Sequence, residues 1–202
     1  QLIASIMNMQ MRRAHTPEVK QVLKGLQDRI MSLATIHRGL YQTSGLADIH
    51  ADELLGDIVR QIITLGSGPD RRFDLDLDID DIRMTPDQAV PLSLLLTEAV
   101  TNAMKYTPAS VGTTPRIVVH LKRQDGDTAV LSVLNPRTDQ ADRTKMAERL
   151  TAATGLGTQL LQAFAMQVGG TLTQEIGDAT YKVMVRFAIE TLDLAEDRGI
   201  PV

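Results

Sequence analysis

The sequence predicts an α+β protein in which an antiparallel helical hairpin precedes an α/β sandwich. Apolar residues recur at near-heptad spacing through the first 45 residues, a pattern typical of paired helices. Apolar and acidic residues alternate from Phe73 to Asp80 with the period of two of a half-exposed strand. After Gly66, helical and strand-like segments interleave, which favours helices packed on a sheet.

The hairpin is predicted over residues 1–45. Thr16 is placed to cap the second helix, with Pro17 at its first position, and Gly45 marks its end. The apolar stripe of that helix comprises Val19, Val22, Leu23, Leu26, Ile30, Leu33, Ile36 and Leu40. Two helices alone cannot bury such a stripe, so we expect two chains to form a four-helix bundle as a homodimer. The alternative is that the stripe packs only on the rest of its own chain.

The second domain is predicted over residues 46–190, followed by a frayed, acidic tail over 191–202. Its first helix runs from Asp52 to Leu65, before the alternating strand at Phe73 to Asp80. The alternating aspartates face water, and they lack the glycine and terminal glutamate of a calcium loop. The later elements are a helix over 86–106, strands over 116–122 and 129–135, a helical or irregular stretch over 139–153, a helix over 157–168, and strands over 171–176 and 181–189.

Composition excludes several classes of function. The net charge is -4 and no basic run could neutralise several phosphates, so we expect no nucleic-acid partner. Cysteine is absent, which excludes a disulfide framework and a thiolate metal site and is compatible with the cytoplasm. No apolar run reaches the roughly 20 residues that a membrane helix needs. Because Gln1 begins inside an amphipathic pattern, we expect the chain to be a piece of a longer protein.

One polar stripe runs along the helix predicted over 86–106. Glu98, Asn102, Lys105 and Tyr106 fall at i, i+4, i+7 and i+8, on a helix whose other positions are largely apolar. An asparagine carbonyl can bind magnesium, a glutamate can orient a water in the shell of the ion, and a lysine can balance phosphate charge. The alternative is an ordinary solvated helix face.

A glycine pair precedes the helix predicted over 157–168. Gly155, Leu156, Gly157 and Thr158 stand at the start of that helix, where free backbone N–H groups form an anion site. Glycines there let the backbone approach a ligand closely. A lone glycine pair is a weak signal, and the order of the surrounding elements strengthens it.

Taken together, the segments 98–106 and 155–170 resemble the asparagine box and the glycine-rich lid box of sensor histidine kinases. Residues 29–41 resemble the dimerisation hairpin of the HWE-related branch of that family. The resemblance implies a Bergerat-type ATP-binding fold, shared with gyrase, Hsp90 and MutL, with ATP and magnesium as cofactors. It implies Glu98 and Asn102 as catalytic residues, Asn102 as the magnesium ligand, and an ATP site that includes Asn102, Lys105, Tyr106, Asn135, Gly155, Leu156, Gly157, Thr158 and Thr180.

The resemblance also implies a two-component kinase that transfers the γ-phosphoryl of ATP to a histidine and then to a response-regulator aspartate. The family places its acceptor histidine early on the first helix, so we expect it upstream of Gln1. The four histidines present do not occupy that position: His15, His37, His50 and His120. A receiver domain is the implied partner.

The sequence departs from the family at the end of the strand predicted over 129–135. The family has an aspartate there, which accepts a hydrogen bond from the adenine amino group, followed by a glycine. Here the run is Asn135, Pro136, Arg137. A neutral amide accepts a weaker hydrogen bond than a carboxylate, so a degenerate scaffold with weak or absent ATP binding is the first alternative function. A conformational ATPase of the gyrase-like superfamily is the second.

Overall fold

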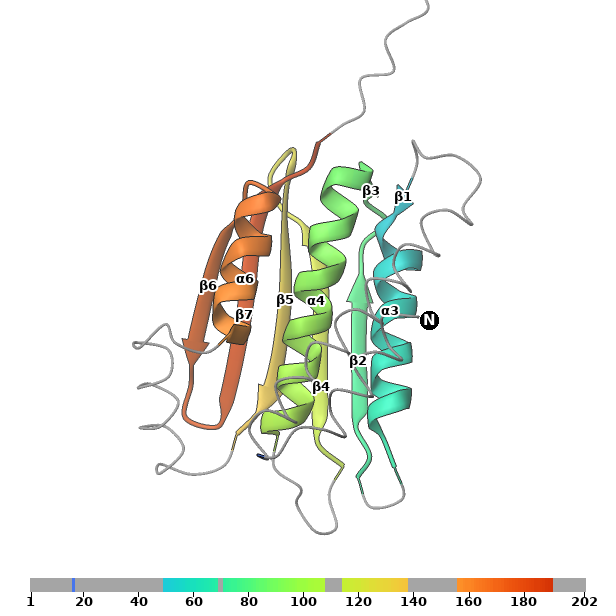
Figure 1. Ribbon diagram of the computed structural model, residues 1–202. Coiled ribbons are helices and arrows are strands. Elements are labelled where there is room, and N and C mark those ends of the chain that lie inside the picture. The colour runs from blue at the N-terminus through green and yellow to red at the C-terminus, as the bar shows by residue number, and fades with distance from the viewer. Residues whose placement is uncertain (1–15, 17–48, 69–70, 108–113, 138–155, 191–202) are drawn as a thin grey trace, which may run out of the picture.

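The chain folds into two layers, one of helices and one of strands (Figure 1). The computed structural model describes residue 16 and residues 49–68, 71–107, 114–137 and 156–190. The predicted hairpin over 1–45, the stretch over 139–153 and the tail over 191–202 lie outside the described residues. Within the described part, the predicted α/β sandwich is confirmed.

The main sheet has five strands in the order β2-β4-β5-β7-β6. Its strands are β2 (Asp74–Ile79), β4 (Arg116–Arg123), β5 (Thr128–Pro136), β6 (Thr171–Ile176) and β7 (Thr180–Ala188). β2 pairs with β4 in parallel, and the other three pairings are antiparallel. Two further strands, β1 (Ile49–His50) and β3 (Arg83–Met84), pair antiparallel in a separate small sheet. The sequence predicted neither of these, because two-residue strands carry no periodicity.

The helical layer comprises α3 (Ala51–Gly66), α4 (Pro86–Tyr106) and α6 (Leu156–Gln167). The Thr85 hydroxyl accepts a hydrogen bond from the Gln88 backbone N–H, and Pro86 begins α4. After α6, the Gly170 N–H donates to the Ala165 carbonyl at 2.8 Å while Gly169 has a φ of 63°. A glycine in this left-handed conformation ends the helix without steric cost.

The core lies between the two layers. α4 is buried along most of its length and packs between α3 and α6, over the middle of the sheet (Figure 1). The Gln88 side chain, 1% exposed, donates to the Ala188 carbonyl and accepts from the Glu190 backbone N–H. These two hydrogen bonds connect the first turn of α4 to the end of β7. They therefore fix the position of the N-terminus of the helix relative to the sheet.

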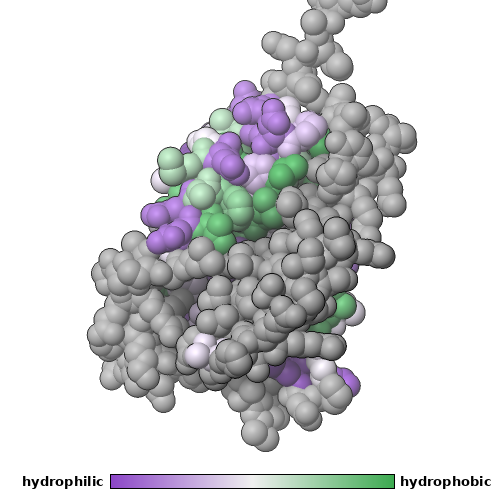
Figure 2. Space-filling view, in the orientation of Figure 1, coloured by the Kyte–Doolittle hydropathy of each residue, from purple (hydrophilic) through white to green (hydrophobic). Residues whose placement is uncertain are grey.

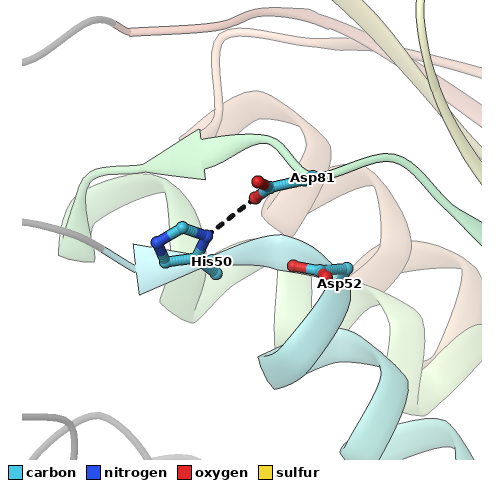
Figure 3. Close-up of side chains that lie close together, drawn as sticks. All are labelled: His50, Asp52 and Asp81. Carbon is cyan, nitrogen blue, oxygen red and sulfur yellow. Dashed lines mark hydrogen bonds and ion pairs between the residues drawn. The ribbon is translucent and has the colours of Figure 1, made fainter.

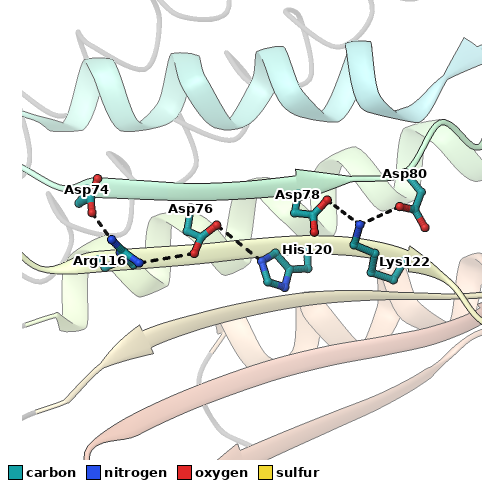
Figure 4. A network of polar contacts seen from close by, with 7 residues as sticks. All are labelled: Asp74, Asp76, Asp78, Asp80, Arg116, His120 and Lys122. Atoms are coloured by element: carbon teal, nitrogen blue, oxygen red, sulfur yellow. Dashed lines mark hydrogen bonds and ion pairs between the residues drawn. The ribbon is translucent and has the colours of Figure 1, made fainter.

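The opposite face of the sheet carries a ladder of opposite charges between β2 and β4 (Figure 4). The pairs are Asp74 with Arg116, Asp76 with Arg116 and His120, and Lys122 with both Asp78 and Asp80. Hydrogen bonding to Lys122 lowers the pKa of Asp80, and hydrogen bonding to Asp78 raises the pKa of Lys122. Pairs this exposed contribute little to stability, because water screens the attraction between their charges. The ladder explains the alternating aspartates as the charged face of an edge strand.

The helix-covered face is not uniformly polar. Figure 2 shows hydrophobic side chains bordered by hydrophilic ones there. Leu65 and Met166 are each more than three-quarters exposed, at 76% and 77%. None of the described helices is both long and apolar enough to cross a bilayer.

Candidate functional site

The polar stripe of α4 lies at the C-terminal half of that helix. The Asn102 Nδ2 donates a hydrogen bond to the Glu98 Oε1 at 3.2 Å. Glu98 is only 8% exposed, which is unusual for a carboxylate and excludes an ordinary solvated face. Because its nitrogen is engaged by Glu98, the amide of Asn102 keeps its carbonyl oxygen to coordinate a cation.

The first turn of α6 lies directly against this stripe. A Cβ added to Gly157 would stand 2.6 Å from the Glu98 Oε1 and 3.3 Å from the Asn102 Nδ2. No side chain fits at 157 unless Glu98 moves, so glycine is required by close approach. The tertiary structure thus brings Gly157 against the polar stripe of α4, although the two segments are far apart in the sequence. A helix N-terminus beside an amide and a carboxylate provides N–H groups for an anion and oxygen ligands for a hard cation.

The other predicted residues flank this contact. Lys105 and Tyr106 are exposed at the end of α4, with the Lys105 Nζ 5.1 Å from the centroid of the Tyr106 ring. Thr158 is half-buried on the first turn of α6. Gly155 and the side chain of Leu156 lie outside the described residues.

Asn135 connects the sheet to the end of α4. It is 2% exposed, and its Nδ2 donates to the Thr107 Oγ1 at 3.1 Å and to the Pro136 carbonyl at 3.0 Å. The Thr107 hydroxyl in turn donates to the Ala103 carbonyl at 2.6 Å. Asn135 therefore holds the last turn of α4 on β5, a role that the sequence did not predict. Thr180 lies on β7 opposite Pro136, beside the same end of β5.

The Arg71 side chain caps the C-terminus of α4. Its Nη2 donates to the carbonyls of Met104 and Thr107, and its guanidinium lies 5.0 Å from the centroid of the Phe73 ring. A cation at this end complements the helix dipole and satisfies carbonyls that have no helical partner. Arg71 therefore fixes the helix end that carries Asn102 and Lys105.

Arg137 and Tyr181 lie at the same end of the sheet. The Arg137 backbone N–H donates to the Ala179 carbonyl at 2.8 Å, and its Nη1 and Nη2 are buried with no hydrogen-bond partner among the described residues. Burial raises the pKa of the Tyr181 phenol to about 12, which Arg137 opposes and Tyr106 reinforces. The Tyr181 hydroxyl donates to the Gln174 Oε1 at 2.7 Å. At this end of the site the Tyr181 phenol is buried, and the Arg137 Nη1 and Nη2 meet no acceptor within the described part of the chain.

The comparisons with known proteins agree with this fold. The family model HisKA_2, described as histidine kinase, matches residues 1–65. The histidine kinase domain of the Erythrobacter litoralis EL346 blue-light activated histidine kinase matches with a TM-score of 0.66 at 13% identity, covering 94% of this chain and 95% of that one. The resemblance to histidine kinases is confirmed.

Two other histidine kinases share the fold. The mycobacterial sensor histidine kinase MprB matches with a TM-score of 0.54 at 16% identity, covering 72% of this chain and 99% of that one. The nucleotide-free catalytic domain of the histidine kinase ThkA matches with a TM-score of 0.52 at 16% identity, covering 70% of this chain and 95% of that one. The chain spans 58% of the longer EL346 histidine kinase chain. No curated protein matches the chain in sequence.

The histidine kinase fold contains functional candidates that sequence reasoning missed. Thr107, Arg71 and Tyr181 carry no local motif, since each acquires its role through a partner distant in the chain. Arg137 was noticed in the sequence only as part of the departure from the family at Asn135, Pro136 and Arg137, and in the structure it lies just beyond the end of β5.

A second polar cluster lies at the opposite end of α4. His50, Asp52 and Asp81 place one potential ligand atom each within 4.8 Å of one another, and the His50 Nδ1 lies 2.7 Å from the Asp81 Oδ1 (Figure 3). His50 pairs with Arg83 in the small sheet, just before α4 begins. A 21-residue helix spans about 30 Å, so the cluster is remote from Asn102 and belongs to a different part of the surface.

Proposed function

We propose that the chain is most of the catalytic core of a sensor histidine kinase that binds a nucleoside triphosphate with magnesium. The observation that carries this proposal is the contact of Gly157 with the Glu98 and Asn102 pair. It supports a single site made of phosphate-binding backbone and cation-binding side chains. The match of residues 1–65 to a histidine kinase family supports phosphoryl transfer to histidine as the reaction.

The residues present fit a magnesium nucleotide. The carbonyl oxygen of Asn102 is a hard ligand, and the buried carboxylate of Glu98 orients either that amide or a water in the shell of the ion. Magnesium, when bound, neutralises charge on the phosphates. The N–H groups of the first turn of α6 bind phosphate oxygens, and Lys105 adds a positive charge at the mouth of the site. Catalysis then consists of positioning and charge neutralisation.

The acceptor and the partners belong to the same proposal. The γ-phosphoryl passes to a histidine upstream of Gln1 and then to the aspartate of a response-regulator receiver domain. Residues 1–45 form the dimerisation hairpin and residues 46–190 the nucleotide-binding domain. The near-heptad stripe and the family match over 1–65 support this division and the homodimer.

The metal role is tested by Asn102→Ala, with Thr101→Ala as the matched control. Thr101 is the exposed neighbour on the same helix turn. We expect Asn102→Ala to abolish the magnesium-dependent part of nucleotide binding in calorimetric titrations. Its free energy of unfolding, obtained from thermal melts, should change by no more than about 1 kcal/mol. Thr101→Ala should bind like the parent. Equal magnesium dependence in both variants would refute the role of Asn102.

The transfer itself is tested on a chain extended upstream to include the expected histidine. Incubation with γ-labelled triphosphate should give an acid-labile, alkali-stable phosphoryl group, and replacement of that histidine should remove it. Label on the chain that survives this replacement would argue against histidine as the acceptor. Free phosphate release without any acceptor would favour the conformational ATPase.

A degenerate scaffold with weak or absent ATP binding is the second candidate function. The guanidinium of Arg137 favours it, because a donor stands just beyond the end of β5, where the family resemblance implies an acceptor for adenine. Histidine phosphorylation of the extended chain would exclude the scaffold, and absence of saturable binding of any magnesium triphosphate at millimolar concentration would exclude the kinase.

A further inference from the structure

The amide of Asn135 begins a short chain of buried hydrogen bonds that leads to the end of α4. Its Nδ2 donates to the Pro136 carbonyl at 3.0 Å and to the Thr107 Oγ1 at 3.1 Å. The Thr107 hydroxyl donates in turn to the Ala103 carbonyl at 2.6 Å. Asn135 and Thr107 are each only 2% exposed, so water competes little for these bonds.

The chemistry of the partners fixes the direction of every bond in this chain. A carbonyl oxygen only accepts, so the Pro136 carbonyl requires an amide nitrogen and the Ala103 carbonyl requires the hydroxyl proton. The Thr107 hydroxyl has a single proton, which Ala103 receives. Its oxygen therefore accepts from Asn135, and both hydrogens of the Asn135 amide are used within the protein.

A carboxylate, which the family resemblance implies at this position, does not fit the chain. Asn135→Asp would place an acceptor opposite the Pro136 carbonyl and opposite a Thr107 oxygen whose proton is already given away. Thr107 could donate to the carboxylate only by releasing the Ala103 carbonyl. Each outcome leaves a buried oxygen without a hydrogen to accept, which is costly. The amide at residue 135 therefore matches the hydrogen bonding around it.

The far end of the chain adjoins the residue proposed to bind magnesium. Ala103 directly follows Asn102, and its carbonyl also accepts from the Thr107 backbone N–H at 3.0 Å. The last carbonyls of a helix have no partner further along it, so a helix end frays unless other groups bind them. A binding group has to be held within about 0.5 Å of its productive place. The position of the last turn of α4 on β5 therefore bears on the site at Asn102.

We infer that Asn135 is a positioning residue of the nucleotide site, which acts through the Thr107 hydroxyl on the end of α4 that carries Asn102. The inference rests on the proposed function and adds a residue requirement to it: an amide at 135, where the family resemblance implies a carboxylate. It assigns the contribution of Asn135 to the metal and phosphate end of the site rather than to contact with the base.

The test compares two ligands in calorimetric titrations of the 202-residue chain with magnesium. They are ATP and purine riboside triphosphate, which lacks the 6-amino group of adenine. We expect Asn135→Asp to weaken both at least about tenfold, because misplacement of a binding group by about 1 Å can cost about a hundredfold. The ratio of the two affinities should stay as it is in the parent, because the base is not what the substitution disturbs.

Two results with Asn135→Asp would overturn the inference. One is a changed ratio of the two affinities, which would show that residue 135 contacts the base. The other is an affinity for ATP equal to that of the parent or higher. Both leave the proposed function standing, whereas a parent chain that binds neither triphosphate would refute the proposed function itself.

Variants of Thr107 test the same chain from its other side, and they decide the matter if Asn135→Asp folds poorly in thermal melts. Thr107→Val keeps the shape and loses the hydroxyl, so it should weaken both triphosphates with their ratio unchanged. Thr107→Ser keeps the hydroxyl and should bind like the parent. Parental binding by Thr107→Val, at a temperature where the melts show it folded, would overturn the inference.

A double variant and a control complete the experiment. With the hydroxyl removed, the carboxylate has no conflict at residue 107, so Asn135→Asp combined with Thr107→Val should bind no more weakly than Asn135→Asp alone. Additive losses would overturn the inference. Ser132→Asp adds a carboxylate to the other face of β5 and should keep parental binding. A loss there as large as that of Asn135→Asp would show that charge on β5 is the cause, and would overturn it too.

Discussion

Gly157→Ala tests whether α6 rests against the polar stripe of α4 as closely as the structure indicates. The added methyl would stand 2.6 Å from the Glu98 Oε1, whereas a comfortable contact needs roughly 3.5 Å. Glu98 is buried and cannot move freely, so the overpacking should cost about 1 to 3 kcal/mol. Alanine recovers up to about 1 kcal/mol through its higher helix propensity.

Taking the middle of both ranges, the expected net loss of stability is about 1 to 2 kcal/mol. For a chain of this size that corresponds to a fall in Tm of about 2 to 8 °C, measured by calorimetry. Magnesium-dependent nucleotide affinity should fall at least about tenfold, because the displaced carboxylate no longer orients Asn102. Gly68→Ala is the matched control, since a Cβ there meets nothing within 4 Å.

A double-mutant cycle tests whether residue 157 and the Glu98 carboxylate are in direct contact. Shortening the carboxylate with Glu98→Ala removes the atom that the methyl at 157 would strike. The two substitutions should therefore be coupled by about 1 kcal/mol or more, with the double variant more stable than the sum of the singles predicts. Additive effects, together with a Gly157→Ala variant as stable as Gly68→Ala, would show that the two helices do not meet at this point.

Three further predictions concern stability. Arg71→Met removes the guanidinium that caps the C-terminus of α4, and it should lower the free energy of unfolding, measured in urea, by roughly 2 to 3 kcal/mol. Arg72→Met, at the exposed neighbour, should leave that free energy nearly unchanged. Burial raises the pKa of the Tyr181 phenol to about 12 in the folded state, so the parent should lose about 2 kcal/mol of stability as the pH rises from about 10 to 12. Tyr181→Phe should not show this loss in thermal melts at alkaline pH. Parallel curves of stability against pH for the parent and the variant would contradict the assignment. Because its pKa is lowered in the folded state, ionised Asp80 adds stability above its ordinary pKa of 3.8, and this contribution is lost as the pH falls through the folded pKa. Asp80→Asn should remove this pH dependence, which is small because water screens so exposed a pair, and an unchanged acid limb of the stability curve would argue against the ladder.

Much of the described fold follows from local sequence. The helix over 86–106 was predicted with the bounds that α4 has. The structure shows the local reason for its start, since the Thr85 hydroxyl caps the helix and Pro86 stands at its first position. The alternation at 73–80 predicted β2, since period two requires only that one strand face be apolar. The helices and strands from 116 to 189 were each placed within about two residues, which is the usual ambiguity at element ends.

The pairing of these elements was decided by tertiary structure. No local sequence pattern specifies that β2 pairs with β4 in parallel at the edge of the sheet. Parallel neighbours are joined by a long crossover connection, here one that includes α4, so the pairing depends on how that helix packs on the sheet. Likewise, Asn135 was expected to face adenine as an acceptor. Its amide nitrogen donates to Thr107, a residue 28 positions away that lies nearby only once α4 packs on β5.

The sequence by itself determined which side chains could do chemistry: an amide and a carboxylate one helical turn apart, and a glycine at a helix start. Residue type and helical period are properties of the chain alone. Only the folded structure set Gly157 against Glu98 and buried that carboxylate, because distances between segments and access to water exist only after the layers have packed.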